Sequence, residues 1–183
     1  NHQPWCAMYP AIAAASACAW GAAPTEERVC DALDRFVFVD ASGEFSRALC
    51  ALGRADPVQK LFCFYHKMFF ASPADAEKLA AECGHDFGAI EGAADFAFAL
   101  SENSSPRCRD AGICRAEVSL GVQMIKWAMR KARGDFAADS REQRKSLKLI
   151  AAQYEDLWLE RAAVGGLAES AGRIRALRPD LFS

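Results

Sequence analysis

Two long amphipathic segments joined by a short link constrain the fold of this chain more than any other feature. They span roughly residues 110–133 and 140–163, and residues 134–139 connect them. In both segments apolar residues recur at intervals of three and four, which is the helical period: Val118, Val122, Ile125 and Met129 in the first, and Leu147, Ile150, Tyr154 and Leu157 in the second. A short link between two long amphipathic helices predicts an antiparallel pair.

Helical periodicity also covers most of the remaining chain, and strand signals are scarce. The string Phe36 to Val39 is rich in β-formers, but it is short and follows a helical pattern. Thr25 stands where a helix N-cap is expected, and Ser72-Pro73 marks the start of another helix. Further helices are predicted at about residues 9–20, 25–37, 45–53, 57–69, 72–83, 87–98 and 167–177. The sequence therefore predicts an all-α fold, arranged as an antiparallel helical bundle.

The segment from Tyr9 to Trp20 is unusual because nearly every residue in it is apolar, and most are alanine. A helix that is apolar on every side is typical of the protein interior, so we expect this helix to be buried. Gly21 and Pro24 end it. We also expect Trp158 to be buried, because it lies beside the apolar stripe of the last long helix.

Charge and hydropathy argue against nucleic-acid binding and against a membrane-spanning segment. The net charge is -2 and the isoelectric point is near 6.0, whereas duplex binding requires a concentrated basic surface. The most basic stretch, Lys126 to Arg133, is interpreted as a solvated helix face. No run of about 18 apolar residues exists, so no membrane span is expected. The partners we expect therefore include no nucleic acid and no membrane.

Eight cysteines occur at irregular spacings, mostly inside apolar helical patterns: Cys6, Cys18, Cys30, Cys50, Cys63, Cys83, Cys108 and Cys114. Buried free cysteine behaves as a small hydrophobe. We therefore expect reduced thiols and a cytoplasmic location. The only close pair, Cys108 and Cys114, has no CxxC motif and no neighbouring histidine, which argues against a zinc site.

No sequence motif supports catalysis. HExxH, GxSxG, the P-loop and GxGxxG are all absent. The spacing of His2 and Cys6 is interpreted as accidental, His66 as a core or rim residue, and His85 as a loop residue. The adjacent carboxylates at 26–27 and 155–156 point about 100° apart on a helix and are interpreted as solvated. We therefore expect no catalytic, cofactor-binding or metal-binding residue, and no cofactor.

Three stretches resemble one enzyme family. Residues 1–21 resemble the end of the catalytic barrel in bacterial family 20 glycoside hydrolases, the β-N-acetylhexosaminidases, where a Tyr-Pro leads into an Ala-rich helix that ends in Trp. Residues 33–53 are similar to the region after that barrel, and so are residues 154–170. The last stretch matches motifs that are frequent in the family: Leu157-Trp158, Arg161, Gly165-Gly166-Leu167 and Glu169-Ser170. Residues 162–164 depart from the family pattern.

The resemblance implies a parent enzyme that removes terminal β-linked N-acetylhexosamine. Such an enzyme uses an adjacent Asp-Glu pair and the acetamido group of the substrate. This sequence contains no Asp-Glu dipeptide, so no catalytic residue is carried over to it. The resemblance makes residues 1–24 a remnant of the barrel end and residues 25–183 a C-terminal α-helical domain.

The implied role is scaffolding, and the expected partners are the chain's own upstream barrel and a second copy of the chain. The alternative is a free-standing helical module that binds or regulates another protein. An independent helical enzyme is disfavoured, since no catalytic cluster is present. When the barrel is absent, residues 9–20 are expected either to mediate self-association or to fold back on the chain's own bundle, and self-association is favoured.

Overall fold

The structure, a computed structural model, describes residues 5–21, 23–55, 64–84, 86–135, 141–162 and 164–182. Within these ranges all regular structure is helical and no strand occurs, which confirms the predicted all-α class. The elements in chain order are η1 (Cys6–Met8), α1 (Tyr9–Ala19), α2 (Glu26–Leu33), η2 (Asp34–Phe38), α3 (Phe45–Arg54), α4 (Phe64–Phe70), α5 (Pro73–Cys83), α6 (Phe87–Asn103), α7 (Ala111–Ala132), α8 (Arg141–Arg161), α9 (Leu167–Arg175) and η4 (Pro179–Leu181).

The chain divides into two compact units. The first contains residues 56–91 and 123–183, together with residues 1–2, and the second contains residues 3–55 and 92–122. Helices α6 and α7 each contribute one part to each unit. The boundary that we predict after residue 24 lies inside the second unit and stays a prediction.

In the first unit, two side-chain contacts establish the direction of α8 relative to the C-terminal part of α7. Gln123 Nε2 donates to Gln153 Oε1 at 2.9 Å, and Arg130 lies 4.0 Å from Glu142. The contacts run in opposite directions along the two helices, as antiparallel neighbours require. Residues of both predicted apolar stripes are buried here: Ile125, Met129, Leu147, Ile150 and Tyr154.

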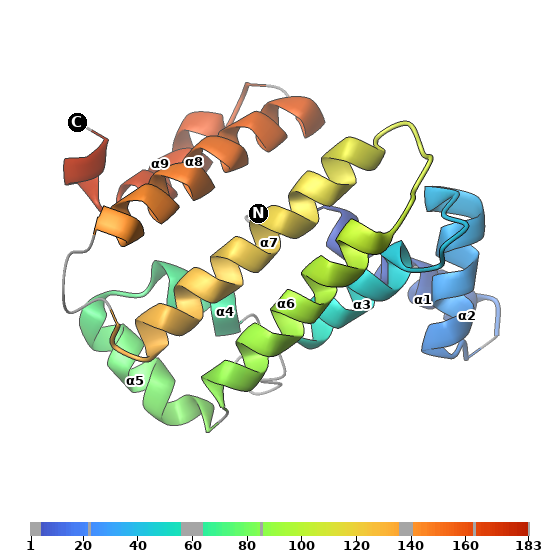
Figure 1. Cartoon of the computed structure of the whole chain (residues 1–183), viewed down its shortest axis with the longest axis horizontal. Coiled ribbons are helices and arrows are strands. Elements are labelled where there is room, and N and C mark those ends of the chain that lie inside the picture. The colour runs from blue at the N-terminus through green and yellow to red at the C-terminus, as the bar shows by residue number, and fades with distance from the viewer. Residues whose placement is uncertain are drawn as a thin grey trace. The chain divides into compact units, whose positions relative to one another are not determined.

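Helix α9 lies beside α8 in the first unit, at the orange and red end of the chain (Figure 1). Trp158 is only half-buried, so the prediction that it is buried is wrong. Its ring lies 6.0 Å from that of Tyr154, and its Cζ2 atom lies 3.5 Å from where a Cβ on Gly166 would stand. Gly165 and Gly166 have no side chains to cover the ring, and both are exposed.

The second unit has an aromatic centre built around Phe38 and Phe45, both fully buried. Their ring centroids are 4.7 Å apart, and the ring of Tyr9 stacks on Phe38 at 5.9 Å. The β-rich string from Phe36 is not a strand, because Phe36 to Phe38 complete the π-helix η2. The helical pattern before it continues by one wider turn, and this turn directs Phe38 into the core.

Helix α1 of the second unit has no buried residue, so the prediction that this apolar helix is buried is wrong. It contacts α2 and α3. Ile12 is 55% exposed, and Trp20, at its C-terminus, is 90% exposed. Composition made this helix suited to burial, but burial depends on how much of the chain packs around it. Packing against α2 and α3 covers only part of its surface.

Local capping follows the sequence signals. Thr25 Oγ1 accepts a hydrogen bond from the Arg28 N–H at 3.3 Å, and Ser72 Oγ accepts one from the Asp75 N–H at 3.2 Å. Each cap satisfies a donor in the first turn of its helix. In the described parts of the chain, no helix combines the length and the apolar character that crossing a bilayer requires.

Candidate metal-binding site

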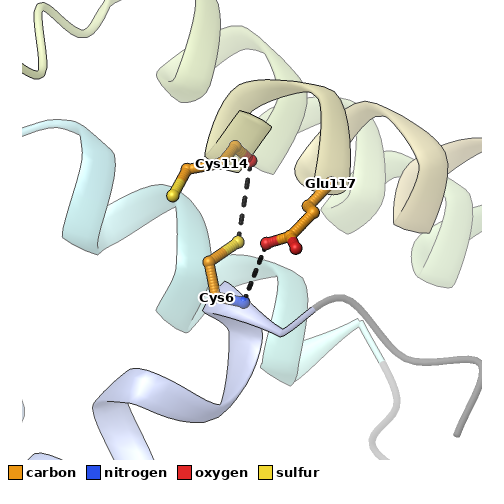
Figure 2. Close-up of side chains that lie close together, drawn as sticks. All are labelled: Cys6, Cys114 and Glu117. Carbon is orange, nitrogen blue, oxygen red and sulfur yellow. Dashed lines mark hydrogen bonds between the residues drawn. The ribbon is translucent and has the colours of Figure 1, made fainter. Parts of the chain in front are cut away.

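Three donor side chains meet in the interior of the second unit. Cys6 is in η1, while Cys114 and Glu117 lie on one face of α7 because they are three positions apart in sequence. Cys6 and Cys114 are fully buried and Glu117 is 2% exposed. Figure 2 shows Cys6 facing the two α7 residues. We call these three residues the buried trio.

Two hydrogen bonds fix the position of Cys6 relative to Cys114 and Glu117. The Cys6 backbone N–H donates to Glu117 Oε2 at 2.9 Å, and the Cys6 thiol donates to the Cys114 carbonyl oxygen at 3.6 Å (Figure 2). The two Sγ atoms and a Glu117 carboxylate oxygen all lie within 4.8 Å of one another. These contacts link residues more than a hundred positions apart in sequence.

The environment keeps the Cys6 thiol protonated. The hydrogen bond to Cys114 contributes most to raising the pKa of Cys6 well above its ordinary value of 9.0, followed by burial and by the nearby Glu117 carboxylate. A thiol is nucleophilic only as the thiolate. Deprotonation of Cys6 therefore needs a compensating positive charge, and a bound cation would supply it.

A second donor group shares one sulfur with the trio. The ligand atoms of Cys108, Asp110 and Cys114 also lie within 4.8 Å of one another. Cys108 and Asp110 are half-buried. Burial is the largest cause that raises the pKa of Cys108 to about 11, and the neighbouring Cys114 and Asp110 add to it. Cys114 thus stands between a fully buried group and a partly accessible one.

A cleft of about 740 Å³ also lies in the second unit, bordered by η2, the turn after it, and Arg107. Val39 has a φ of +51° there, which is rare for a β-branched residue. Hydrogen bonds on both sides hold this conformation: the Asp40 N–H donates to the Asp34 carbonyl oxygen at 2.9 Å, and the Arg107 N–H donates to the Phe38 carbonyl oxygen at 2.9 Å.

The buried carboxylates at this cleft accept hydrogen bonds from backbone N–H groups. Asp40 accepts hydrogen bonds from the N–H groups of Phe45 at 3.0 Å and Ser105 at 3.0 Å, and from Ser42. Burial disfavours its ionisation, but these hydrogen bonds outweigh burial and lower the pKa of Asp40. Burial raises the pKa of Asp34, although Ser46 donates two hydrogen bonds to it. Both groups therefore have structural roles.

The basic stretch of α7 is not uniformly solvated, so that interpretation is wrong at Lys131. Its ammonium group donates to the carbonyl oxygens of Phe69, at 3.2 Å, and Ala71. Burial lowers the pKa of Lys131 from 10.5 to about 8. Arg133 forms a two-pronged ion pair with Glu91, the shorter contact being 2.8 Å.

The other residues singled out from the sequence do not come together. The ring of His66 lies 4.9 Å from that of Phe70, as expected for a rim residue, while His2 and His85 lie outside the described residues. Glu26 forms an ion pair with Arg54, and Glu155 with Arg175. Glu26 and Glu155, one member of each adjacent pair, thus have separate arginine partners.

Seven cysteines fall within the described ranges, and all seven are free thiols: Cys6, Cys18, Cys30, Cys50, Cys83, Cys108 and Cys114. No disulfide links any of these seven, and the expectation that the thiols are reduced stays a prediction; Cys63 lies outside the described residues. No local pattern connects Cys6 to α7, so its approach to Cys114 could not be read from the sequence. The Cys-x-x-Glu spacing of Cys114 and Glu117 on one helix was an available signal.

Comparison with known proteins gives no assignment. A scan of protein-family models, a search of curated proteins and a search of solved structures each find no significant match to this chain.

Proposed function

We propose that this chain is the non-catalytic C-terminal helical region of a β-N-acetylhexosaminidase-like glycoside hydrolase. The parent enzyme would remove terminal β-linked N-acetylhexosamine, and this region would support its catalytic barrel. The sequence resemblance of residues 1–21, 33–53 and 154–170 to family 20 enzymes supplies the family. One structural observation, the exposure of α1, is consistent with the scaffolding role.

Helix α1 presents an apolar surface that the described chain leaves open. The helix contains no charged residue, none of its residues is buried, and Ile12 and Trp20 are more than half exposed. A contiguous exposed apolar surface marks an interface in most proteins. In the family that the sequence resembles, the equivalent helix closes the barrel, and the barrel would cover the face of α1 that α2 and α3 leave exposed.

The chain supplies no catalytic machinery for this reaction. The Asp-Glu pair of the family is absent from the sequence. Of the adjacent carboxylates that do occur, Glu26 and Glu155 each form an ion pair with an arginine. We propose that hydrolysis belongs to the upstream barrel, while this region contributes stability and position.

The decisive test is the reading frame upstream of the codon for Asn1. An open frame that encodes a (β/α)8 barrel with an Asp-Glu pair would support the proposal. A start codon directly before Asn1 would contradict it and favour the alternative, a free-standing helical module. Such a module would use the same exposed face of α1 to bind a partner protein.

A further inference from the structure

We infer that Cys6, Cys114 and Glu117, the buried trio, bind a zinc ion that links η1 to α7. The first ground is the kind of donor. Thiolate sulfur and carboxylate oxygen are both zinc ligands, with bond lengths of about 2.3 Å and 2.0–2.2 Å. A tetrahedral ion would hold such atoms about 3.5–3.8 Å apart. The three ligand atoms lie within 4.8 Å of one another and would supply three of the four ligands, with a water molecule as the fourth.

The second ground is the rigidity of the positions. Cys114 and Glu117 are one turn apart on α7, a helix of 22 residues, which fixes their separation. The hydrogen bond of 2.9 Å from the Cys6 N–H to Glu117 Oε2 fixes Cys6 relative to that helix. All three residues are buried, so water competes weakly with the protein ligands for the ion. Fixed ligands in a dry setting favour tight binding.

The third ground is selectivity among cations. Calcium and magnesium prefer oxygen ligands throughout, and two sulfur donors exclude them. A set of two sulfurs and one carboxylate suits zinc. Binding replaces the thiol protons: each Cys–SH becomes a thiolate bonded to the ion, and two protons are released per zinc. The thiol hydrogen bond from Cys6 to the Cys114 carbonyl oxygen is broken in this exchange.

Cys108 and Asp110 are further donors at the Cys114 sulfur. They are half-buried, and Cys108 stands in the loop before α7. We assign the ion to the trio because its three members are on regular elements and are buried on all sides. A site centred on Cys108 and Asp110 is a different assignment, and the experiment separates the two.

The test uses the full chain, stripped with a chelator and titrated with Zn²⁺ in competition with a chromophoric chelator. One zinc per chain, release of two protons and a higher melting temperature are expected. Titration with Co²⁺ should give the charge-transfer absorption of cobalt thiolate, which reports sulfur ligation without any variant. A chain that binds no zinc, or that gives no such absorption with cobalt, would overturn the assignment.

Matched variants locate the ion. Cys6→Ser and Glu117→Gln should each weaken zinc binding by at least the 10–100-fold that loss of a second-shell group costs in other sites. Gln keeps an acceptor for the Cys6 N–H, so Glu117→Gln removes the ligand while retaining the fold, and circular dichroism verifies this. Cys18→Ser, at an exposed thiol, and Cys30→Ser, at a buried thiol near Cys50, should bind as the unmodified chain does.

Two further outcomes would contradict the assignment. If Cys6→Ser and Glu117→Gln bind zinc as tightly as the unmodified chain, the ion lies elsewhere. If Cys108→Ser abolishes binding while Cys6→Ser does not, the ion belongs to the group of Cys108 and Asp110. The zinc site does not depend on the proposed hydrolase family, and either proposal can fail alone.

Discussion

Lys131 places a charged side chain in a partly buried position of the first unit. Its ammonium group donates to the carbonyl oxygen of Phe69, one residue before the end of α4, and to that of Ala71, which follows the helix. It also lies 5.2 Å from the centroid of the Trp127 ring. The last carbonyl groups of a helix have no intrahelical donors, so this cation serves as a C-terminal cap.

This geometry predicts a specific dependence of stability on pH. Burial lowers the pKa of Lys131 from 10.5 to about 8, so between these values the folded chain binds fewer protons than the unfolded chain. Below about pH 8 burial of the charged ammonium costs stability, and this cost is relieved as the pH rises toward 10.5, so the free energy of unfolding increases over that window. The difference in unfolding free energy between the unmodified chain and Lys131→Met should therefore increase over this window. A difference that stays flat in urea titrations would show that the ammonium is solvated.

The half-buried side chain of Trp158 leads to a second prediction. A fully buried tryptophan replaced by alanine costs about 3–5 kcal/mol, and half-burial should reduce the cost to below about 3 kcal/mol. The matched control is Leu159→Ala, one residue further along α8 and 52% exposed, which should change stability by less than about 0.5 kcal/mol. Equal melting temperatures for Trp158→Ala and the unmodified chain would show that the contacts with Tyr154 and Gly166 contribute nothing.

At the scale of elements, helix α1 determines how the isolated chain behaves in solution. Self-association through α1 is expected, because its apolar surface is open and uncharged. The double variant Ile12→Lys and Trp20→Lys should shift the chain toward monomer, since two charges oppose burial of that surface. Val164→Lys, at an exposed apolar residue of the first unit, is the control and should leave association unchanged. Light scattering over a range of concentrations measures both, and a strictly monomeric unmodified chain would contradict the expectation.

Some features of the helices could be predicted from the sequence and others could not. The caps at Thr25 and Ser72 were predictable because each depends on a hydrogen bond spanning three residues. The π-helical end of α2 was not, because its wider turn depends on burying Phe38 against Phe45 and Tyr9. The exposure of α1 was hidden for a related reason: composition states how apolar a helix is, while its burial depends on what the rest of the chain places around it.

The candidate site, too, could be predicted from the sequence only in part. Cys114 and Glu117 have helical spacing, and their common face could be read from the sequence. Cys6 meets them through a contact across 111 residues. No periodicity within one element reports such a contact, so the sequence alone favoured isolated thiols.

For the whole molecule, we predict that the chain alone does not hydrolyse aryl N-acetyl-β-glucosaminides. The expectation follows from the absent Asp-Glu pair and holds under both proposed functions. Release of the aryl group should equal that of a buffer blank over a broad range of pH. Turnover that persists through repeated purification and is proportional to chain concentration would contradict the prediction.

Each of the two units is assembled from separate stretches of chain, and this has a consequence for biosynthesis. Residues 3–55 emerge from the ribosome before residues 92–122, which their unit also needs. At about 5–20 residues per second, the nascent segment waits for several seconds before its remaining helices are synthesised. During that delay α1 and the aromatic residues around Phe38 lack part of their unit. This interval is when the nascent chain most needs a chaperone, and slow codons between residues 56 and 91 would lengthen it.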